Sequence, residues 1–160
     1  MAYLGTLLDT QIDSVPRSDN SACYHVRSGN GVSAYRCLVA DDDPTILRLV
    51  AEMLSELSFQ VDTAEDGRKA FDRISAHSYD LVVTDLEMPE MNGFLLASRT
   101  KHLSGGTKTV IMTGRCHAEV FGMMSTAIVD AWLFKPFGLN ELCQTLDDLK
   151  IFNYKPAVNG

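Results

Sequence analysis

Five short apolar runs alternate along this chain with stretches whose apolar residues recur every three or four positions. The runs predict strands at Cys37–Ala40, Phe59–Asp62, Leu81–Thr84, Thr109–Met112 and Ala131–Phe134. The periodic stretches predict helices at Pro44–Leu57, Gly67–Ala76, Phe94–Thr100, His117–Thr126 and Leu139–Leu149. Regular alternation of apolar strands with helices predicts an α/β fold, a parallel sheet with right-handed crossovers.

This regular pattern starts at Tyr35 and ends near Lys150, within a chain of 160 residues that is long enough for one domain with a core. Residues 1–34 have the polar composition of a loop, interrupted by apolar residues at helical spacing, namely Leu4, Leu8, Ile12 and Val15. We expect a flexible N-terminal extension, with a docking or dimer-forming arm as the alternative. Residues 151–160 are expected to form a C-terminal tail.

The composition restricts the class of protein. Hydrophobic residues make up 46% of the chain, which excludes a disordered protein, and a net charge of −7 disfavours direct binding of nucleic acid. No segment is apolar enough to span a membrane, and Met1–Leu8 lacks the basic region of a secretion signal. We therefore expect a cytoplasmic protein with reduced cysteines and with other proteins as partners. No histidine site is indicated by the scattered His25, His77, His102 and His117.

Polar side chains that suit phosphate chemistry follow four of the predicted strands. Asp41–Asp43 follow the first strand, Asp85 the third, Thr113 the fourth and Lys135 the fifth. Because open α/β sheets bind ligands at the carboxyl ends of their strands, we expect these side chains to gather at one edge. A nucleophilic carboxylate, an acidic cluster, a hydroxyl and an amine are suited to handling phosphate and Mg²⁺.

Four motifs in order resemble the receiver domain of bacterial two-component response regulators, of the chemotaxis-regulator type. They are Leu38–Pro44, Thr84–Gly93, Met112–Gly114 and Phe134–Phe137, with Ala64–Ala70 as a weaker fifth. The steps from Asp42 to Asp85, Thr113 and Lys135 in turn are 43, 28 and 22 residues. The resemblance covers residues 36 to about 150. It implies a flavodoxin-like, doubly wound sheet of order 2-1-3-4-5 with helices on both faces.

The resemblance also implies roles for the acidic residues. Asp85 is expected to be the phosphoacceptor, whose carboxylate attacks phosphorus and becomes an aspartyl phosphate. Asp41 and Asp42 are expected to bind Mg²⁺ together with Asp85, and the family pattern adds the backbone carbonyl of Glu87 as a ligand. Asp43 fits a helix N-cap better than a metal ligand.

Thr113 and Lys135 are expected to bind phosphoryl oxygens, and Lys135 also to pair with Asp85. In the family a cis bond joins the residues that correspond to Lys135 and Pro136, an isomer that the sequence does not show. Movement of Thr113 towards the phosphoryl group makes room for an aromatic side chain, which aligns here with Trp132. The alternative is that Trp132 is a core or edge aromatic in both states.

Two further features of the site region differ between receivers or depart from their usual pattern. Glu87 and Arg115 flank the expected phosphoryl position, where they can pair with each other or orient water, and should tune the phosphoryl lifetime. Ile128 and Val129 stand where the family usually has Gly-Ala, so the loop before the fifth strand must take another shape. Gly122 makes the preceding helix a poor helix former. An unusual partner surface or a homodimer is therefore plausible.

The leading hypothesis is a stand-alone receiver that catalyses only its own phosphorylation and dephosphorylation. A sensor histidine kinase or a histidine phosphotransfer protein would supply the phosphoryl group, and a separate protein effector would read the change of state. A switch is not distinguished here from a relay or phosphate sink. One alternative is a phosphorylation-independent interaction or dimerisation module. A phosphohydrolase with an aspartate nucleophile is less favoured, because Glu87 replaces the second aspartate of such enzymes.

Overall fold

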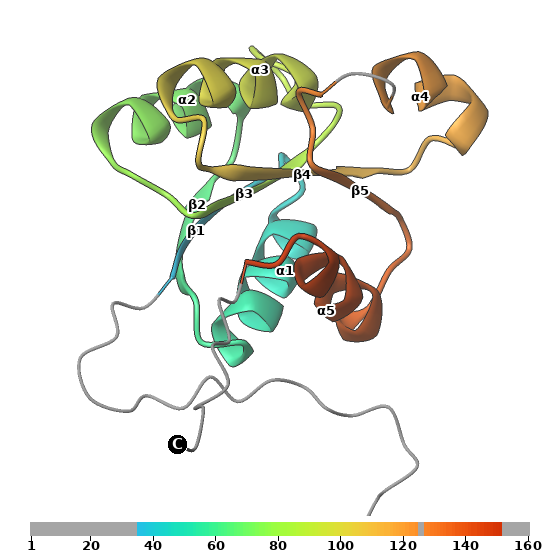
Figure 1. Ribbon diagram of the computed structural model, residues 1–160, viewed down its shortest axis with the longest axis horizontal. Helices are drawn as coiled ribbons and strands as arrows, with labels where there is room; N and C mark the ends of the chain where they lie inside the picture. The colour runs from blue at the N-terminus through green and yellow to red at the C-terminus, as the bar shows by residue number, and fades with distance from the viewer. Residues whose placement is uncertain (1–34, 125–126, 152–160) are drawn as a thin grey trace, which may run out of the picture.

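The computed structural model describes residues 35–124 and 127–151, which form a five-stranded parallel sheet between two layers of helices (Figure 1). The strands are β1 (Arg36–Ala40), β2 (Gln60–Ala64), β3 (Leu81–Asp85), β4 (Lys108–Thr113) and β5 (Ala131–Phe134). The helices are α1 (Pro44–Glu56), α2 (Gly67–Ala76), α3 (Gly93–Leu103), α4 (His117–Met124) and α5 (Leu139–Asp148). The expected N-terminal arm, 1–34, and residues 152–160 of the expected tail lie outside the described residues.

The strands lie in the order β2-β1-β3-β4-β5, which confirms the predicted doubly wound topology. The direction of winding reverses between β1 and β3, and this reversal is where open α/β sheets bind ligands. The register brings the ends of the strands level, through the pairs Ala40–Thr84, Asp85–Met112 and Thr113–Phe134. Residues that directly follow β1, β3, β4 and β5 therefore share one edge of the sheet.

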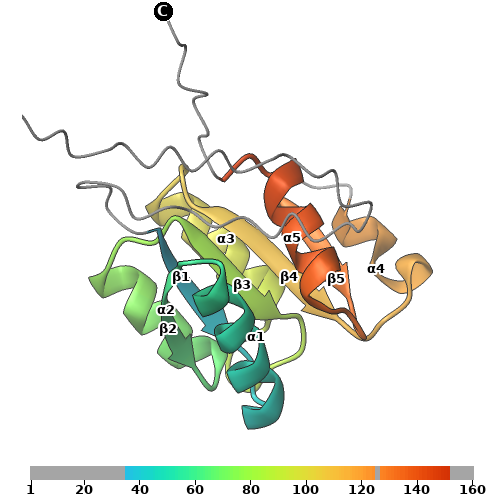
Figure 2. The same ribbon diagram turned by 90° about the horizontal axis from the view of Figure 1, so that it is seen from below.

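Helices cover both faces of the sheet, as predicted. Figure 2 shows α1 and α5 on the near face, with α2, α3 and α4 behind the sheet. The α1–α5 side is one apolar cluster in which Leu54 and Leu146 are fully buried, and it includes the buried side chains of Cys37 and Cys143. The opposite side divides into two clusters, one under α2 and α3 and one under α3 and α4. The central strands β1, β3 and β4 are buried by helices on both sides, which explains their continuous apolar sequence.

Side-chain caps start α1 and α3, the helices that follow the loops after β1 and β3, here called the site loops. Asp43 Oδ1 accepts the backbone N–H groups of Thr45 at 2.8 Å and Ile46 at 3.4 Å, which confirms Asp43 as the N-cap of α1. Asn92 does the same for α3 by accepting the N–H of Leu95 at 2.8 Å. These caps satisfy backbone donors that the first helical turn leaves without a partner, and so fix where each site loop ends.

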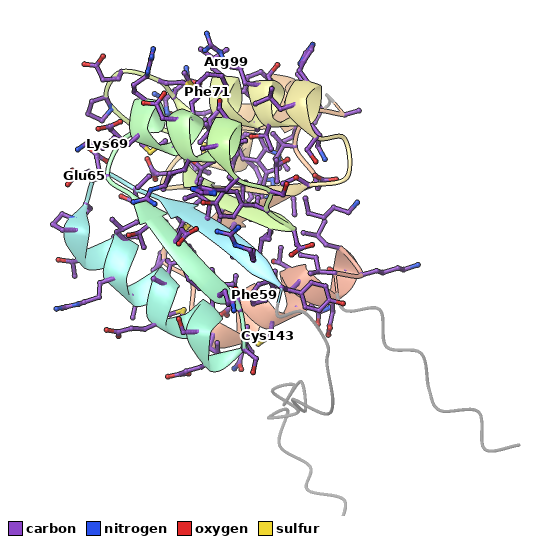
Figure 3. The ribbon with its side chains drawn as sticks, turned by 90° about the vertical axis from the view of Figure 1, so that its left-hand side faces the viewer. Phe59, Glu65, Lys69, Phe71, Arg99 and Cys143 are labelled. Carbon is purple, nitrogen blue, oxygen red and sulfur yellow. The ribbon has the colours of Figure 1, made fainter. Side chains whose placement is uncertain are left out.

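Two glycines permit close approach between α2, α3 and the loop that follows β3. A Cβ atom on Gly67 would lie 1.9 Å from the Met91 carbonyl oxygen, and one on Gly93 would lie 2.1 Å from the carbonyl oxygen of Asp85. No other residue fits such contacts without displacing backbone. On the outer side, Arg99 of α3 lies over the ring of Phe71 of α2, as Figure 3 shows.

The second strand begins one residue later than predicted and ends two residues later. Phe59 lies in the turn that follows α1 and not in the strand: its N–H donates to Leu54 O at 3.1 Å, and the preceding Ser58 has a positive φ of 67°. Its apolar ring is buried in the core without being part of β2. The strand then continues to Ala64, which pairs with Ala40.

Ile128 and Val129, which precede β5, have backbone conformations that need no glycine. Of the described residues only Ser58, Glu90 and Lys150 are non-glycine residues with positive φ, so Ile128 and Val129 avoid that region. The Asp130 carboxylate holds this segment by accepting from Lys101 Nζ at 2.6 Å and from the Thr109 N–H at 2.8 Å. Burial opposes the charged form of Asp130, but these hydrogen bonds keep the pKa of its carboxyl below the ordinary value. The prediction of another shape for the Ser125–Val129 loop stays a prediction, because residues 125 and 126 lie outside the described residues.

Candidate functional site

The polar residues singled out in the sequence gather at the carboxyl edge of the sheet. Asp41 follows β1, Asp85 ends β3, Thr113 ends β4 and Lys135 follows β5. Asp41 and Thr113 are each 1% exposed, and Asp85 is 8% exposed. Buried polar groups of this kind need partners, and each of them has one.

Lys135 lies between two of the carboxylates. Its Nζ donates to Asp85 Oδ1 at 2.6 Å and to Asp41 Oδ2 at 2.9 Å. The second oxygens accept backbone N–H groups, Asp85 Oδ2 from Glu87 at 2.8 Å and Asp41 Oδ1 from Asp43 at 2.9 Å. The peptide bond from Lys135 to Pro136 is cis, the isomer found in the family that the sequence resembles. These contacts hold both carboxylates in fixed orientations.

The two carboxylates, Asp41 and Asp85, share a single ammonium, so one negative charge is left over. Burial raises the pKa of the Asp85 carboxyl, and the negative charge of Asp41 acts in the same direction, so that Lys135 offsets these effects only in part. Burial disfavours the ammonium of Lys135, but its hydrogen bonds to Asp85 and Asp41 raise its pKa above the ordinary value. The ammonium is therefore firmly protonated, while Asp85 carries a negative charge that its surroundings oppose.

The expected metal ligands surround this unbalanced charge without forming a closed cluster. Within residues 35–124 and 127–151, no three acidic, histidine or cysteine side chains converge as a ready-made metal site. Asp42, the residue after Asp41 in the chain, is exposed and lines a groove together with Glu87. The donor set consists of oxygen atoms only, and each carboxylate oxygen has a second lone pair available, so the residues fit a hard divalent cation. The assignments of Asp41, Asp42, Asp85 and the Glu87 carbonyl as ligands stay predictions.

Thr113, Glu87 and Arg115 form the other wall of the site. Thr113 Oγ1 accepts the N–H of Arg115 at 3.0 Å, and none of the described residues accepts a hydrogen bond from the Thr113 hydroxyl. The Arg115 guanidinium pairs with the Glu87 carboxylate across the groove, which lowers the pKa of Glu87 and raises that of Arg115. The two residues expected to flank the phosphoryl group are thus in contact. Their effect on its lifetime stays a prediction.

Trp132 lies on β5 beside Ile111 of β4, half-buried against the cluster under α3 and α4. It also lines a groove with Phe137 and Glu141 at the outer edge of the sheet. The ring thus has both a packed and an exposed side. Its part in a switch stays a prediction.

One contact in the site region was missed by the sequence reasoning. The ring of His117, the first residue of α4, stacks on the ring of Phe134, with centroids 3.9 Å apart and planes inclined by 22°. The two residues are 17 positions apart in the sequence and belong to different elements. No spacing rule joins them, so only the folded structure reveals the pair.

A buried aspartate at the end of β3, a second acidic residue after β1 and a lysine after β5 lie together at the carboxyl edge of a doubly wound sheet of the flavodoxin-like class. The family model for the response regulator receiver domain matches residues 37–147. The chain belongs to the response regulator receiver family, and the resemblance stated from the sequence is confirmed.

Similar proteins carry the domain within longer chains. The chain is 37% identical over 109 residues to the sensor histidine kinase RcsC of Salmonella typhi, covering 68% of this chain and 12% of that protein. It is 34% identical over 126 residues to the transcriptional regulatory protein TcrA of Mycobacterium tuberculosis, covering 73% of this chain and 49% of that protein. The matched region therefore spans less than half of these relatives.

Solved receiver structures share the fold. The response regulator TrrA of Thermotoga maritima, solved in complex with Mg²⁺ and BeF, matches with a TM-score of 0.65 and 32% identity, covering 72% of this chain and 98% of that one. The chemotaxis response regulator CheY4 of Vibrio cholerae matches with a TM-score of 0.65 and 27% identity, again covering 72% and 98%. No helix within the described part of the chain is long and apolar enough to cross a membrane.

Proposed function

We propose that Asp85 is the site at which this receiver domain is phosphorylated. The observation that carries the proposal is the placement of Lys135 Nζ 2.6 Å from Asp85 and 2.9 Å from Asp41, at the switch point of the sheet. A structural aspartate gains nothing from a second buried carboxylate beside it, whereas a nucleophile that must receive a phosphoryl group needs cations around it.

The chemistry follows from the fixed orientation of Asp85. One of its carboxylate oxygens attacks phosphorus, the bond from phosphorus to the donor's leaving atom breaks, and the leaving group departs with the electron pair of that bond. Lys135 balances negative charge on the phosphoryl oxygens. Thr113, whose hydroxyl has no acceptor among the described residues, donates a hydrogen bond to one of them. The reaction is self-catalysed, and hydrolysis of the acyl phosphate returns the domain to its starting state.

Mg²⁺ fits the acidic side of the site. Asp41, Asp42 and Asp85, with the backbone carbonyl of Glu87, are the residues that would hold it, and the related TrrA structure contains Mg²⁺ with BeF. The ion would supply positive charge next to the transferring oxygens. Two carboxylates that share one ammonium leave negative charge for a cation to neutralise, which supports the assignment.

The phosphoryl donor is expected to be a sensor histidine kinase or a histidine phosphotransfer protein, and the output is a change of surface read by a protein effector. Thr113 and Trp132 would connect the site to that surface, while Glu87 and Arg115 would tune the lifetime of the phosphoryl group. Phe121 on α4 is 73% exposed, which supports α4 as part of an interaction surface or of a homodimer contact.

The test is intact-mass spectrometry of the purified protein with acetyl phosphate and Mg²⁺. The wild type should gain one phosphoryl adduct, and EDTA added before the donor should prevent it. D85N should gain none. D43N is the matched control, because asparagine also caps a helix and Asp43 has no assigned role in the chemistry. It should react like the wild type.

Three outcomes would contradict the proposal. If the wild type gains no adduct from acetyl phosphate or from a phosphorylated histidine donor, the interaction-module alternative is favoured. If the protein continuously hydrolyses unrelated phosphate monoesters without any kinase, the phosphohydrolase alternative is favoured. An adduct that forms equally on D85N would show that the acceptor is another residue.

A further inference from the structure

Thr113 and Lys135, the two residues expected to bind phosphoryl oxygens, come from neighbouring strands that are joined through their backbones. The N–H of Lys135 donates to Thr113 O at 2.7 Å. Thr113 is also the register partner of Phe134, the residue that precedes Lys135. The first residue of the loop after β4 is therefore attached to Phe134, the last residue of β5, and to Lys135, which follows it.

The loop itself, residues 113–117, is held by its own side chains around a glycine. Thr113 Oγ1 accepts the N–H of Arg115 at 3.0 Å, which orients the hydroxyl. Gly114 has open space where a Cβ would lie, so no packing restrains it. Glu119 Oε2 accepts the N–H of Cys116 at 2.9 Å and so starts α4. These bonds fix the loop internally, but they do not attach it to Lys135.

The far end of the same loop returns to β5 through the His117–Phe134 stack, at 3.9 Å between ring centroids. His117 is otherwise exposed, and Phe134 is half-buried against the cluster under α3 and α4. Both ends of the loop are thus attached to residues 134 and 135. A short loop with both ends fixed has few conformations left, even with a glycine inside it.

We propose that His117 is a positioning residue, which acts through Phe134 to keep the Thr113 hydroxyl and the Lys135 ammonium at a fixed separation. This inference rests on the proposed function, because it concerns the geometry that receives the phosphoryl group. Asp41 and Asp42, the residues proposed to bind Mg²⁺, follow β1 and lie outside this loop. Losing the stack should slow phosphoryl transfer without weakening the binding of Mg²⁺.

The experiment compares three variants of the full chain. H117A removes the ring, H117F keeps an aromatic ring for stacking, and H102A removes another exposed histidine, on α3, whose ring nitrogen contacts Ser98 O instead of an aromatic. The initial rate of phosphorylation by acetyl phosphate is measured by intact mass at saturating Mg²⁺. Mg²⁺ affinity and the urea unfolding midpoint are measured alongside.

We expect H117A to react about threefold to tenfold more slowly, in line with the size of aromatic pair interactions, and H117F and H102A to stay within about twofold of the wild type. Mg²⁺ affinity should be unchanged in all three. If H117A reacts like the wild type, or if H117F is as slow as H117A, the positioning role is overturned while the proposed function stands. A parallel loss of Mg²⁺ affinity in H117A also overturns it, because the defect is then general. A wild type that cannot be phosphorylated overturns the proposed function, and this inference with it.

Discussion

Asp85 carries its negative charge in a place that burial makes unfavourable. The carboxylate shares the ammonium of Lys135 with Asp41, so two negative charges face one positive charge in a partly desolvated site. On the proposed function, such an arrangement would lower the stability of the resting domain and would favour binding of a cation. Functional sites commonly contain shifted pKa values of this kind.

Replacing Asp85 with asparagine should therefore stabilise the protein at neutral pH in the presence of EDTA. The folded state raises the pKa of Asp85, so the charged form destabilises the fold above that pKa and ceases to do so as the pH falls towards the ordinary value of 3.8. We expect the melting temperature of D85N to exceed that of the wild type by a few degrees at pH 7, since 1 kcal/mol corresponds to about 4 to 8 °C in a domain of about 100 residues.

The difference between D85N and the wild type should shrink as the pH approaches 4. D72N is the control, because Asp72 forms an exposed pair with Arg68 on α2, and its replacement should change little at either pH. A D85N protein that melts below the wild type at pH 7 would show that the bond to Lys135 outweighs the burial of the charge.

Residues at the ends of strands could be placed from the sequence, and residues that meet across elements could not. Asp85 and Lys135 each follow an apolar strand, so parallel pairing alone brings them to one edge. The stack of His117 on Phe134 and the bond from Lys101 to Asp130 depend on how α4 and α3 pack, which no local spacing encodes. Contacts of this kind depend on two elements together, whereas a hydrophobic pattern in the sequence describes one element at a time.

Helix α3 starts directly against the backbone of Asp85. Its first residue, Gly93, donates its N–H to Leu86 O at 2.9 Å and lies so close to the Asp85 carbonyl that a Cβ would be 2.1 Å from that oxygen. The Asn92 cap fixes the same turn from the other side. The start of this helix therefore determines the position of the backbone at Asp85.

Substituting Gly93 with alanine should force that backbone apart. We expect G93A to lose about 2 to 3 kcal/mol of unfolding free energy, because the added methyl group meets backbone atoms and not a movable side chain. G105A is the matched control, since Gly105 lies in an open turn with nothing within 4 Å of the added Cβ. Urea denaturation of both variants tests this. Equal stability of G93A and the wild type would mean that the helix can shift without cost.

The extent of the elements also shows the limit of periodicity. Strand β4 includes Lys108 and Thr113 beyond the predicted run, because each pairs with a neighbouring strand, Lys108 with Leu81 and Thr113 with Phe134. Polar residues at strand ends carry no apolar signal, so their inclusion depends on the partner strand. Phe59 shows the converse, an apolar residue that packs in the core from the turn after a helix.

The complete site exists only because two halves of the sheet meet. The carboxylates lie at the ends of β1 and β3, while the hydroxyl and the ammonium lie at the ends of β4 and β5. A ligand that binds only the folded state stabilises the whole domain, even when the residues that bind it lie in one half.

Mg²⁺ should therefore raise the melting temperature of the whole domain. At a concentration one hundred times the dissociation constant, the gain is about 2.7 kcal/mol for a single site. D42N should lose this response, whereas D43N, altered at the neighbouring helix cap, should retain it. Calorimetry with and without EDTA makes the comparison. An undiminished Mg²⁺ response in D42N would remove Asp42 from the ligand set.

The exposed turn at residues 104–106 joins α3 to β4, where the added Cβ atoms of both glycines would meet nothing within 4 Å. The acidic residues of the site precede this turn in the sequence, and Thr113 and Lys135 follow it. A chain divided at this turn would yield two complementary fragments, neither of them able to retain a phosphoryl group alone. On the proposed function, phosphorylation of Asp85 would then require the two fragments to reassemble, so that an adduct would report their association.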